Sequence, residues 1–204
     1  MRIVLASKSP RRREILAGLG LKFDVIVSEA EEKGDLLHPD AYVSHVALEK
    51  ALAVQALLRE RGEWDGNTLI LAADTIVWAG GEVLGKPRDA EDAKRMLRLL
   101  SDGEHEVISG YSVIYQSQFL SGSCHTKVGF GELTDRDIDW YVASGEPMDK
   151  AGAYAVQGLA SMWIYGLQGD YFNVVGLPVN AIDGCMKRQL GFSLVDLVEK
   201  HPLA

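Results

Sequence analysis

A single carboxylate lies inside the most apolar stretch of the chain. Residues 69–79 read LILAADTIVWA, in which Asp74 interrupts a run of small and aliphatic residues. Such a run predicts a strand that is buried on both faces. Because an unpaired buried carboxylate is very costly, Asp74 must be ion-paired, protonated, bound to a metal or placed at the mouth of the strand. Three of these four settings are typical of active sites, and an acid that caps the next turn is the structural alternative.

Hydroxyl and basic side chains are concentrated in the first loop. After a short apolar strand at residues 3–6, residues 7–13 read SKSPRRR. Ser9 fits a helix N-cap and Pro10 fits the first helical position, so the arginines stand at a helix N-terminus. The hydroxyls, backbone N–H groups and cations together form a site for an anion such as phosphate. A solvated basic turn is the alternative, but cations there oppose the helix dipole, which favours a bound anion.

Two lysines occupy positions that raise the same question. Lys50 falls on the apolar stripe of a helix predicted at residues 40–60, next to Glu49. Either its stem carries the ammonium out to solvent, or the ammonium meets a buried acid or a phosphate. Lys86 stands between a glycine and a proline, which predicts a loop near a strand end. An acidic loop at residues 29–32 offers natural ligands for Mg²⁺, although most acidic loops are merely solvated.

The order of predicted elements indicates the fold class. Strands are expected at residues 3–6, 23–27, 69–79, 105–116, 119–130 and 162–167, with a brief strand after a hairpin turn at Gly80 and Gly81. Helices are expected near residues 10–19, 40–60, 89–100, 134–142 and 178–190, and a weak one at 193–200. The glycine-rich segment 145–158 is either a plain loop or a ligand-lining one, and 169–173 is a turn. This order predicts an α/β protein with a mixed sheet.

Composition limits the class of partner. The 204 residues carry a net charge of −8, which argues against a nucleic-acid binder but allows a small phosphorylated ligand at a local basic cluster. No apolar run approaches the roughly 20 residues that span a membrane, and the N-terminus does not read as a signal peptide. Cys124 and Cys185 lack metal-ligand spacing and are predicted to be free thiols in a reducing compartment. We therefore expect a soluble cytoplasmic protein.

Six motifs occur in the order and spacing of a known family. They are SxSPRR after the first strand, ADT inside the apolar strand, LGKP, LS followed by HxV, DKAGAYxxQG and VVGLP. On these motifs the chain resembles the Maf family of nucleotide pyrophosphatases over about residues 3–190, which implies one Maf-like domain spanning 1–204. The glycine expected after LS is Asp102 here, a turn residue. P-loop and Rossmann nucleotide proteins are excluded because neither GxxxxGK[ST] nor GxGxxG is present.

The resemblance implies an activity and a site. The activity is hydrolysis of a nucleoside triphosphate to the monophosphate and pyrophosphate with a divalent cation, usually Mg²⁺, and the implied role is to clear non-standard or excess nucleotides. The fold is an elongated α/β one with a central mixed sheet and a two-lobed cleft, similar to inosine triphosphate pyrophosphatases, and a homodimer is expected. Asp74 is then the general base, in contact with the metal, and Glu32 is a metal-side acid. The residues expected to hold phosphates are Ser7, Arg12, Lys50 and Lys86, and further candidates are Glu49 and Lys150.

Three positions separate the subfamilies that this chain resembles. Members acting on dTTP and UTP have Arg after SP, Thr after AD and Gln before the glycine of the late loop, whereas members acting on 7-methyl-GTP have Trp, Gln and Glu. Arg11, Thr75 and Gln157 match the first kind, and an amide can pair with a pyrimidine edge whereas Glu suits a purine's donors. The sequence therefore predicts hydrolysis of dTTP and UTP, with modified pyrimidine nucleotides as further substrates. The alternatives are the 7-methyl-GTP specificity and a nucleotide-binding regulator of septum formation whose hydrolysis is incidental.

Overall fold

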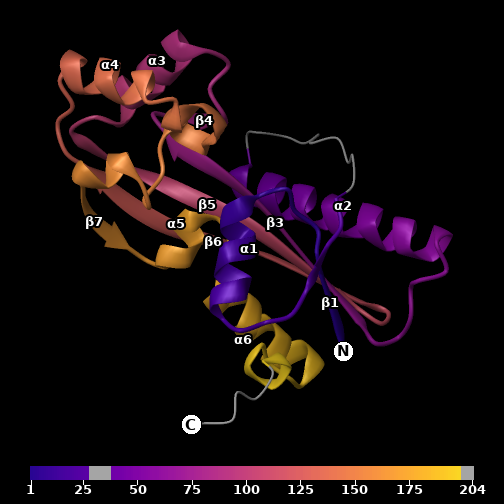
Figure 1. The fold of residues 1–204 in the computed structure, drawn as a ribbon. Helices are drawn as coiled ribbons and strands as arrows, with labels where there is room; N and C mark the ends of the chain where they lie inside the picture. Colours follow the sequence, from indigo (N-terminus) through magenta and orange to yellow (C-terminus); the bar gives the residue numbers. More distant parts are fainter. Residues whose placement is uncertain (28–37, 199–204) are drawn as a thin grey trace, which may run out of the picture.

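The computed structural model describes residues 1–27 and 38–198, and it contains a seven-stranded sheet (Figure 1). The strands are β1 (Arg2–Leu5), β2 (Asp24–Val25), β3 (Thr68–Ala79), β4 (Glu82–Leu84), β5 (Gly103–Tyr115), β6 (Gln118–Phe130) and β7 (Ile164–Gln168). Their order is β2-β1-β3-β5-β6-β7, and β4 pairs with the end of β3. β1 runs parallel to β2 and β3, whereas the other pairs are antiparallel. The predicted α/β class with a mixed sheet is confirmed.

The helices mostly follow the predicted pattern, with two corrections. They are α1 (Pro10–Gly18), α2 (Pro39–Glu60), α3 (Ala90–Leu100), α4 (Asp135–Ala143), α5 (Tyr171–Val175) and α6 (Val179–Leu190), with 3₁₀ turns η1 (Glu146–Asp149), η2 (Ala151–Ala153), η3 (Leu159–Met162) and η4 (Val195–Leu197). The turn predicted at 169–173 was wrong, because the Asp170 carboxylate accepts the N–H groups of Phe172 and Asn173 and so caps α5. The helix predicted at 193–200 is a 3₁₀ turn within its described part, because the Asp196 carboxylate holds Ser193 in a local turn.

Alternation along β3 sends its side chains to two different layers (Figure 1). Ile70 and Ala72 pack against α2, which crosses one face of the sheet. Leu69 and Leu71 pack against α1 and α6 on the opposite face. Both faces of β3 are therefore covered, which explains why residues 69–79 read as an almost continuous apolar run.

A separate apolar core packs α3 and α4 against strands at one end of the sheet. It joins Met96 of α3 and Tyr141 of α4 to Val107 of β5, Phe130 of β6 and Ala153 of η2. We call α3, α4, β4 and the segment 146–162 the α3/α4 lobe; Figure 1 shows α3 and α4 side by side at one end of the molecule. Asp102, where the family resemblance predicts glycine, has φ +54° in the turn before β5, a conformation that glycine adopts most easily.

One edge of β3 is partly open. β1 ends at Leu5, opposite Leu71, and β4 pairs only with Val77–Ala79. Among the described residues, no strand covers this edge between 72 and 76, and Asp74 lies in the gap. Side chains from both faces of β3 can therefore reach the same opening.

Two predictions about the whole chain can be compared with the structure. Within residues 1–27 and 38–198, none of the helices has the length and apolar character that a bilayer crossing requires. Cys124 and Cys185 are both free thiols, as predicted. The assignment of residues 1–204 to a single domain stays a prediction.

Candidate active site

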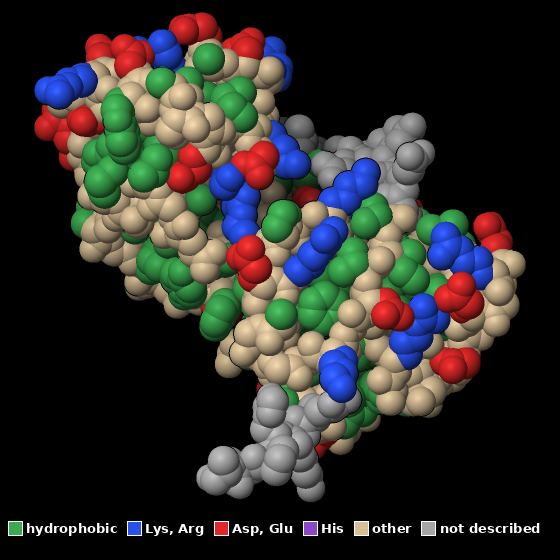
Figure 2. Space-filling model, in the orientation of Figure 1, with side chains coloured by type: hydrophobic (Ala, Val, Ile, Leu, Met, Phe, Trp, Pro, Cys, Tyr) green, Lys and Arg blue, Asp and Glu red, His purple; other side chains and the backbone are tan. Residues whose placement is uncertain are grey.

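A cleft of about 950 Å³ lies at the open edge of β3, between the α3/α4 lobe and the rest of the molecule. Figure 2 shows Lys and Arg side chains gathered around the hollow between these two parts. The predicted site residues among those that line the cleft are Ser7, Arg11, Arg12, Lys50, Asp74, Thr75, Lys86, Lys150 and Gln157. Glu49 is exposed on α2 and is not among the lining residues, and Glu32 lies outside the described residues. The tertiary structure therefore assembles residues that are spread over 150 positions of sequence.

Asp74 is ion-paired with Lys50. Lys50 Nζ lies 2.7 Å from Asp74 Oδ1, and the two side chains are 19% and 12% exposed. Of the four settings considered for Asp74, two are therefore realised: the carboxylate has a cationic partner, and it stands at an opening of the sheet. Lys50 likewise uses its place on the apolar stripe to meet an acid rather than to reach solvent. The attraction between the two charges offsets part of the cost of removing both from water.

A glycine opposite Asp74 allows this pair to form. Gly110 of β5 is the register partner of Asp74, and a Cβ at this position would lie 2.1 Å from the carbonyl oxygen of Val43. The backbone of α2 thus contacts the sheet directly at Gly110. Lys50 follows Val43 by about two helical turns and faces the same side of the sheet. Close approach of α2 therefore sets the position from which Lys50 reaches Asp74.

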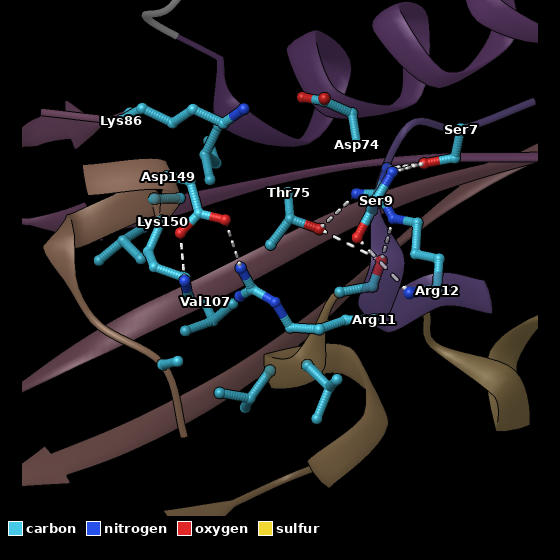
Figure 3. Close-up of a pocket in the computed structure, with 18 of the residues that line it drawn as sticks. Ser7, Ser9, Arg11, Arg12, Asp74, Thr75, Lys86, Val107, Asp149 and Lys150 are labelled. Carbon is cyan, nitrogen blue, oxygen red and sulfur yellow. Dashed lines mark hydrogen bonds and ion pairs between the residues drawn. The ribbon is translucent and has the colours of Figure 1, made fainter. Parts of the chain in front are cut away.

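Arg12 is buried and uses its guanidinium mainly to hold the walls of the cleft together (Figure 3). Its Nε donates to the carbonyl oxygen of Gly176, at 2.7 Å, and its Nη1 donates to that of Ala73, at 2.7 Å. Nη1 also donates to Ser7 Oγ at 3.1 Å, and Nη2 donates to Thr75 Oγ1 at 3.1 Å. Arg12 therefore joins α1 to the open edge of β3 and to the end of α5. Its predicted contact with phosphate stays a prediction.

Ser7 has one hydrogen-bonding group left for a ligand. Ser7 Oγ accepts hydrogen bonds from Ser9 N, at 3.2 Å, and from Arg12 Nη1. These two bonds occupy both lone pairs, so the hydroxyl hydrogen remains. No acceptor for it is recorded in the described part of the chain. The hydroxyl belongs to a residue that is only 6% exposed and lines the cleft, a setting that suits an anionic oxygen.

The hydroxyl of Thr75 is engaged in the wall of the cleft. Thr75 Oγ1 lies 2.8 Å from Ser109 Oγ, and Ser109 Oγ in turn donates to the carbonyl oxygen of Asn173 at 3.0 Å. Thr75 Oγ1 also accepts from Arg12 Nη2 and lies 3.4 Å from the carbonyl oxygen of Gly176, to which it can donate. Sequence reasoning did not identify Ser109 and Asn173 as residues of the cleft wall. The only signal was Ser109, a polar residue among the apolar residues of β5.

The other cations enter the cleft from different elements. Lys86 is exposed on the loop after β4, and the described residues include no partner for its ammonium. Lys150 donates to the carbonyl oxygen of Glu146 at 3.1 Å and contacts the carboxylate of Asp149. Lys8 and Asp149 also line the cleft. Both lie inside motifs already singled out, SKSPRRR and DKAGAY, yet neither was predicted as a site residue.

The donor set fits Mg²⁺ that is shared with a substrate. Within the described ranges there is no group of three or more His, Cys, Asp or Glu residues that could hold a metal by itself. Mg²⁺ in nucleotide sites, however, is usually bound by one or two carboxylates together with phosphate oxygens and water. Asp74 supplies a carboxylate on the wall of the cleft, so a nucleotide would complete such a site.

Comparisons with known proteins agree with the motifs. The family model described as Maf-like protein matches residues 2–189. A "dTTP/UTP pyrophosphatase" of Anaeromyxobacter dehalogenans (strain 2CP-C) is 48% identical over 200 residues, which cover 95% of this chain and 96% of that relative. A protein of the same name from Thermoanaerobacter sp. (strain X514) is 42% identical and covered completely, over 96% of this chain. A solved structure described as the Staphylococcus aureus Ham1 protein aligns with a TM-score of 0.47 at 12% identity, covering 97% of this chain and 94% of that one.

Proposed function

The chain belongs to the Maf family, and we propose that it hydrolyses dTTP and UTP to the monophosphate and pyrophosphate. The observation that carries the proposal is the Lys50–Asp74 pair at the open edge of β3, inside a cleft lined by several further cations. The curated relatives named dTTP/UTP pyrophosphatase support the choice of substrate. The cytoplasm, where nucleoside triphosphates are made and used, is the compartment that this role implies.

Asp74 is the proposed general base. A carboxylate that contacts both an ammonium and the cleft can accept a proton from a water molecule as that water attacks the phosphate chain. Lys50 holds this carboxylate in one orientation through the 2.7 Å contact. Phosphoryl transfer needs little covalent help from protein, so a positioned base and positioned cations supply most of the required machinery.

The cations stabilise the charge that develops on the leaving pyrophosphate. Lys86 and Lys50 both line the cleft, where their charges can act on the phosphates. Ser7 also lines it and offers its hydroxyl hydrogen to a phosphate oxygen. A divalent cation such as Mg²⁺ would supply further positive charge beside the phosphates. Asp74 would hold this ion, and Glu32 is proposed as a second ligand. Glu49 and Lys150 stay candidates, as does the expected homodimer.

Base selection is assigned to Arg11, Thr75 and Gln157. All three line the cleft. Gln157 is exposed to the cavity and has an amide that can both donate to and accept from a pyrimidine edge. Thr75 uses its hydroxyl within the wall, so it acts on the base through the shape of the wall and the position of Arg12.

A nucleotide panel tests the proposal. Pyrophosphate release is measured with dTTP, UTP, CTP, ATP, GTP and 7-methyl-GTP in the presence of Mg²⁺, and again after chelation with EDTA. We expect turnover of dTTP and UTP, loss of turnover with EDTA and recovery when Mg²⁺ is added back. A preference for 7-methyl-GTP would overturn the assigned specificity. Binding of nucleotides without hydrolysis of any of them would refute the enzyme and favour the regulator.

A further inference from the structure

A carboxylate stands between two cations in the cleft. Figure 3 shows Asp149 of η1 between Arg11 of α1 and Lys150. Asp149 Oδ1 accepts a hydrogen bond from Lys150 Nζ, and Asp149 Oδ2 lies 3.6 Å from Arg11 Nη2. The two carboxylate oxygens are thus divided between a residue of the α3/α4 lobe and a residue of the opposite wall. Asp149 has no part in the function proposed above.

Arg11 depends on this contact for its orientation. Asp149 is the one ion-pair partner that the described residues offer to Arg11, and a separation of 3.6 Å makes the contact ionic rather than a hydrogen bond. Arg11 also lies in the first turn of α1, where the helix dipole repels a cation. A long side chain in that position samples many rotamers unless an opposite charge draws it to one side. The Asp149 carboxylate supplies that charge from across the cleft.

Asp149 is ionised at neutral pH. Burial opposes its ionisation, but the hydrogen bond and charge of Lys150, together with the charge of Arg11, outweigh burial and hold the pKa of Asp149 below its ordinary value. Lys150 is itself fixed by its hydrogen bond to the Glu146 carbonyl oxygen, so Asp149 is anchored on one side. The anchored carboxylate can therefore act as a fixed point for Arg11.

We propose that Asp149 is a positioning residue for base selection, which holds the Arg11 guanidinium in the orientation that distinguishes a pyrimidine from a purine nucleotide. This inference rests on the proposed function. The simpler alternative is that Asp149 only reduces the positive charge of the cleft. That alternative affects UTP and GTP alike, because both bring the same phosphate chain and a neutral base. The ratio of kcat/KM for UTP to kcat/KM for GTP cancels this common effect, because both bases are neutral, and so isolates the contribution of the base.

The experiment is a double-mutant cycle on that ratio with Asp149→Asn, Arg11→Ala and the combined variant. The matched control is Asp139→Asn. Asp139 lies in the same lobe as Asp149 and is also paired with a lysine, and its side chain is 61% exposed, compared with 64% for that of Asp149. We expect Asp149→Asn to lower the ratio by about 3- to 10-fold, mainly through a higher KM for UTP, as for coupled neighbours. Adding Asp149→Asn to Arg11→Ala should then change the ratio no further, and Asp139→Asn should leave it unchanged.

Three outcomes would overturn the inference. One is an unchanged ratio in Asp149→Asn with tighter binding of every triphosphate, which would make Asp149 a counter-charge only. Another is full additivity with Arg11→Ala, and the third is an equal effect of Asp139→Asn. Asp149→Glu, which keeps the charge, should restore part of the ratio, and circular dichroism of each variant verifies its fold. Failure of the wild type to hydrolyse UTP would refute the proposed function instead, a result visible before any variant is compared.

Discussion

Replacing Asp74 with asparagine separates the chemistry of the site from its architecture. In the wild-type protein, Asp74 Oδ1 lies 2.7 Å from Lys50 Nζ. Asparagine keeps the size of the side chain and an oxygen that can accept a hydrogen bond from Lys50 Nζ, but it cannot take a proton from water. General-base catalysis contributes about 10²- to 10⁴-fold to rate, so we expect kcat for UTP to fall by that factor.

The same substitution should cost little stability. Because the hydrogen bond survives, the loss is confined to the ionic part of a pair at the wall of a cleft, about 1–2 kcal/mol. For a chain of this size each kcal/mol lowers Tm by about 2–4 °C, which gives a decrease of about 2–8 °C. Initial rates of pyrophosphate release at saturating UTP and Mg²⁺, together with thermal unfolding followed by circular dichroism, measure both quantities.

Asp183→Asn is the matched control. Asp183 is 20% exposed and lies 2.6 Å from Lys187 on α6, away from the residues that line the cleft. We expect this variant to lose comparable stability while its kcat stays at the wild-type value. The assignment of Asp74 as the base would be refuted if Asp74→Asn, still folded, retained more than about a hundredth of wild-type kcat, because removal of a general base should cost at least about 10²-fold.

Three further predictions concern packing, specificity and pH. Gly110→Ala should destabilise the protein by about 1–3 kcal/mol in urea titrations and lower activity, because the new Cβ would displace α2; Gly66→Ala, with open space around it, is its control. Gln157→Glu should lower kcat/KM for UTP by about 10- to 100-fold and raise it for 7-methyl-GTP, because a carboxylate only accepts hydrogen bonds. Burial lowers the pKa of His105 from 6.5 to about 4, so its contribution to stability is present above pH 6.5 and is lost as the pH falls toward 4. The loss is about 3 kcal/mol, measured by urea midpoints across this range, and His105→Gln should flatten the profile.

Local patterns predicted most of the elements. The apolar run at residues 69–79, the N-cap at Ser9 and the apolar stripe of α2 each report a short-range physical preference, and the structure confirms all three. The same reasoning failed at α5, because five helical residues carry too short a pattern to be distinguished from a turn. It also left open whether residues 145–158 were a plain loop; they fold into two 3₁₀ turns, and their later part lines the cleft.

The sequence by itself determined which chemical groups are present and which of them are out of place: an acid in an apolar strand, a lysine on an apolar stripe and arginines at a helix N-terminus. Only the tertiary structure decided how these groups pair. Asp74 could have met any of several cations, and the contact of the α2 backbone with Gly110 selected Lys50. Nothing in the local pattern distinguishes the surroundings of Arg12 from those of Arg11, yet Arg12 is bound to the walls of the cleft whereas Arg11 faces Asp149 across it. Such differences depend on long-range packing, because neighbouring residues on one helix turn toward different surroundings.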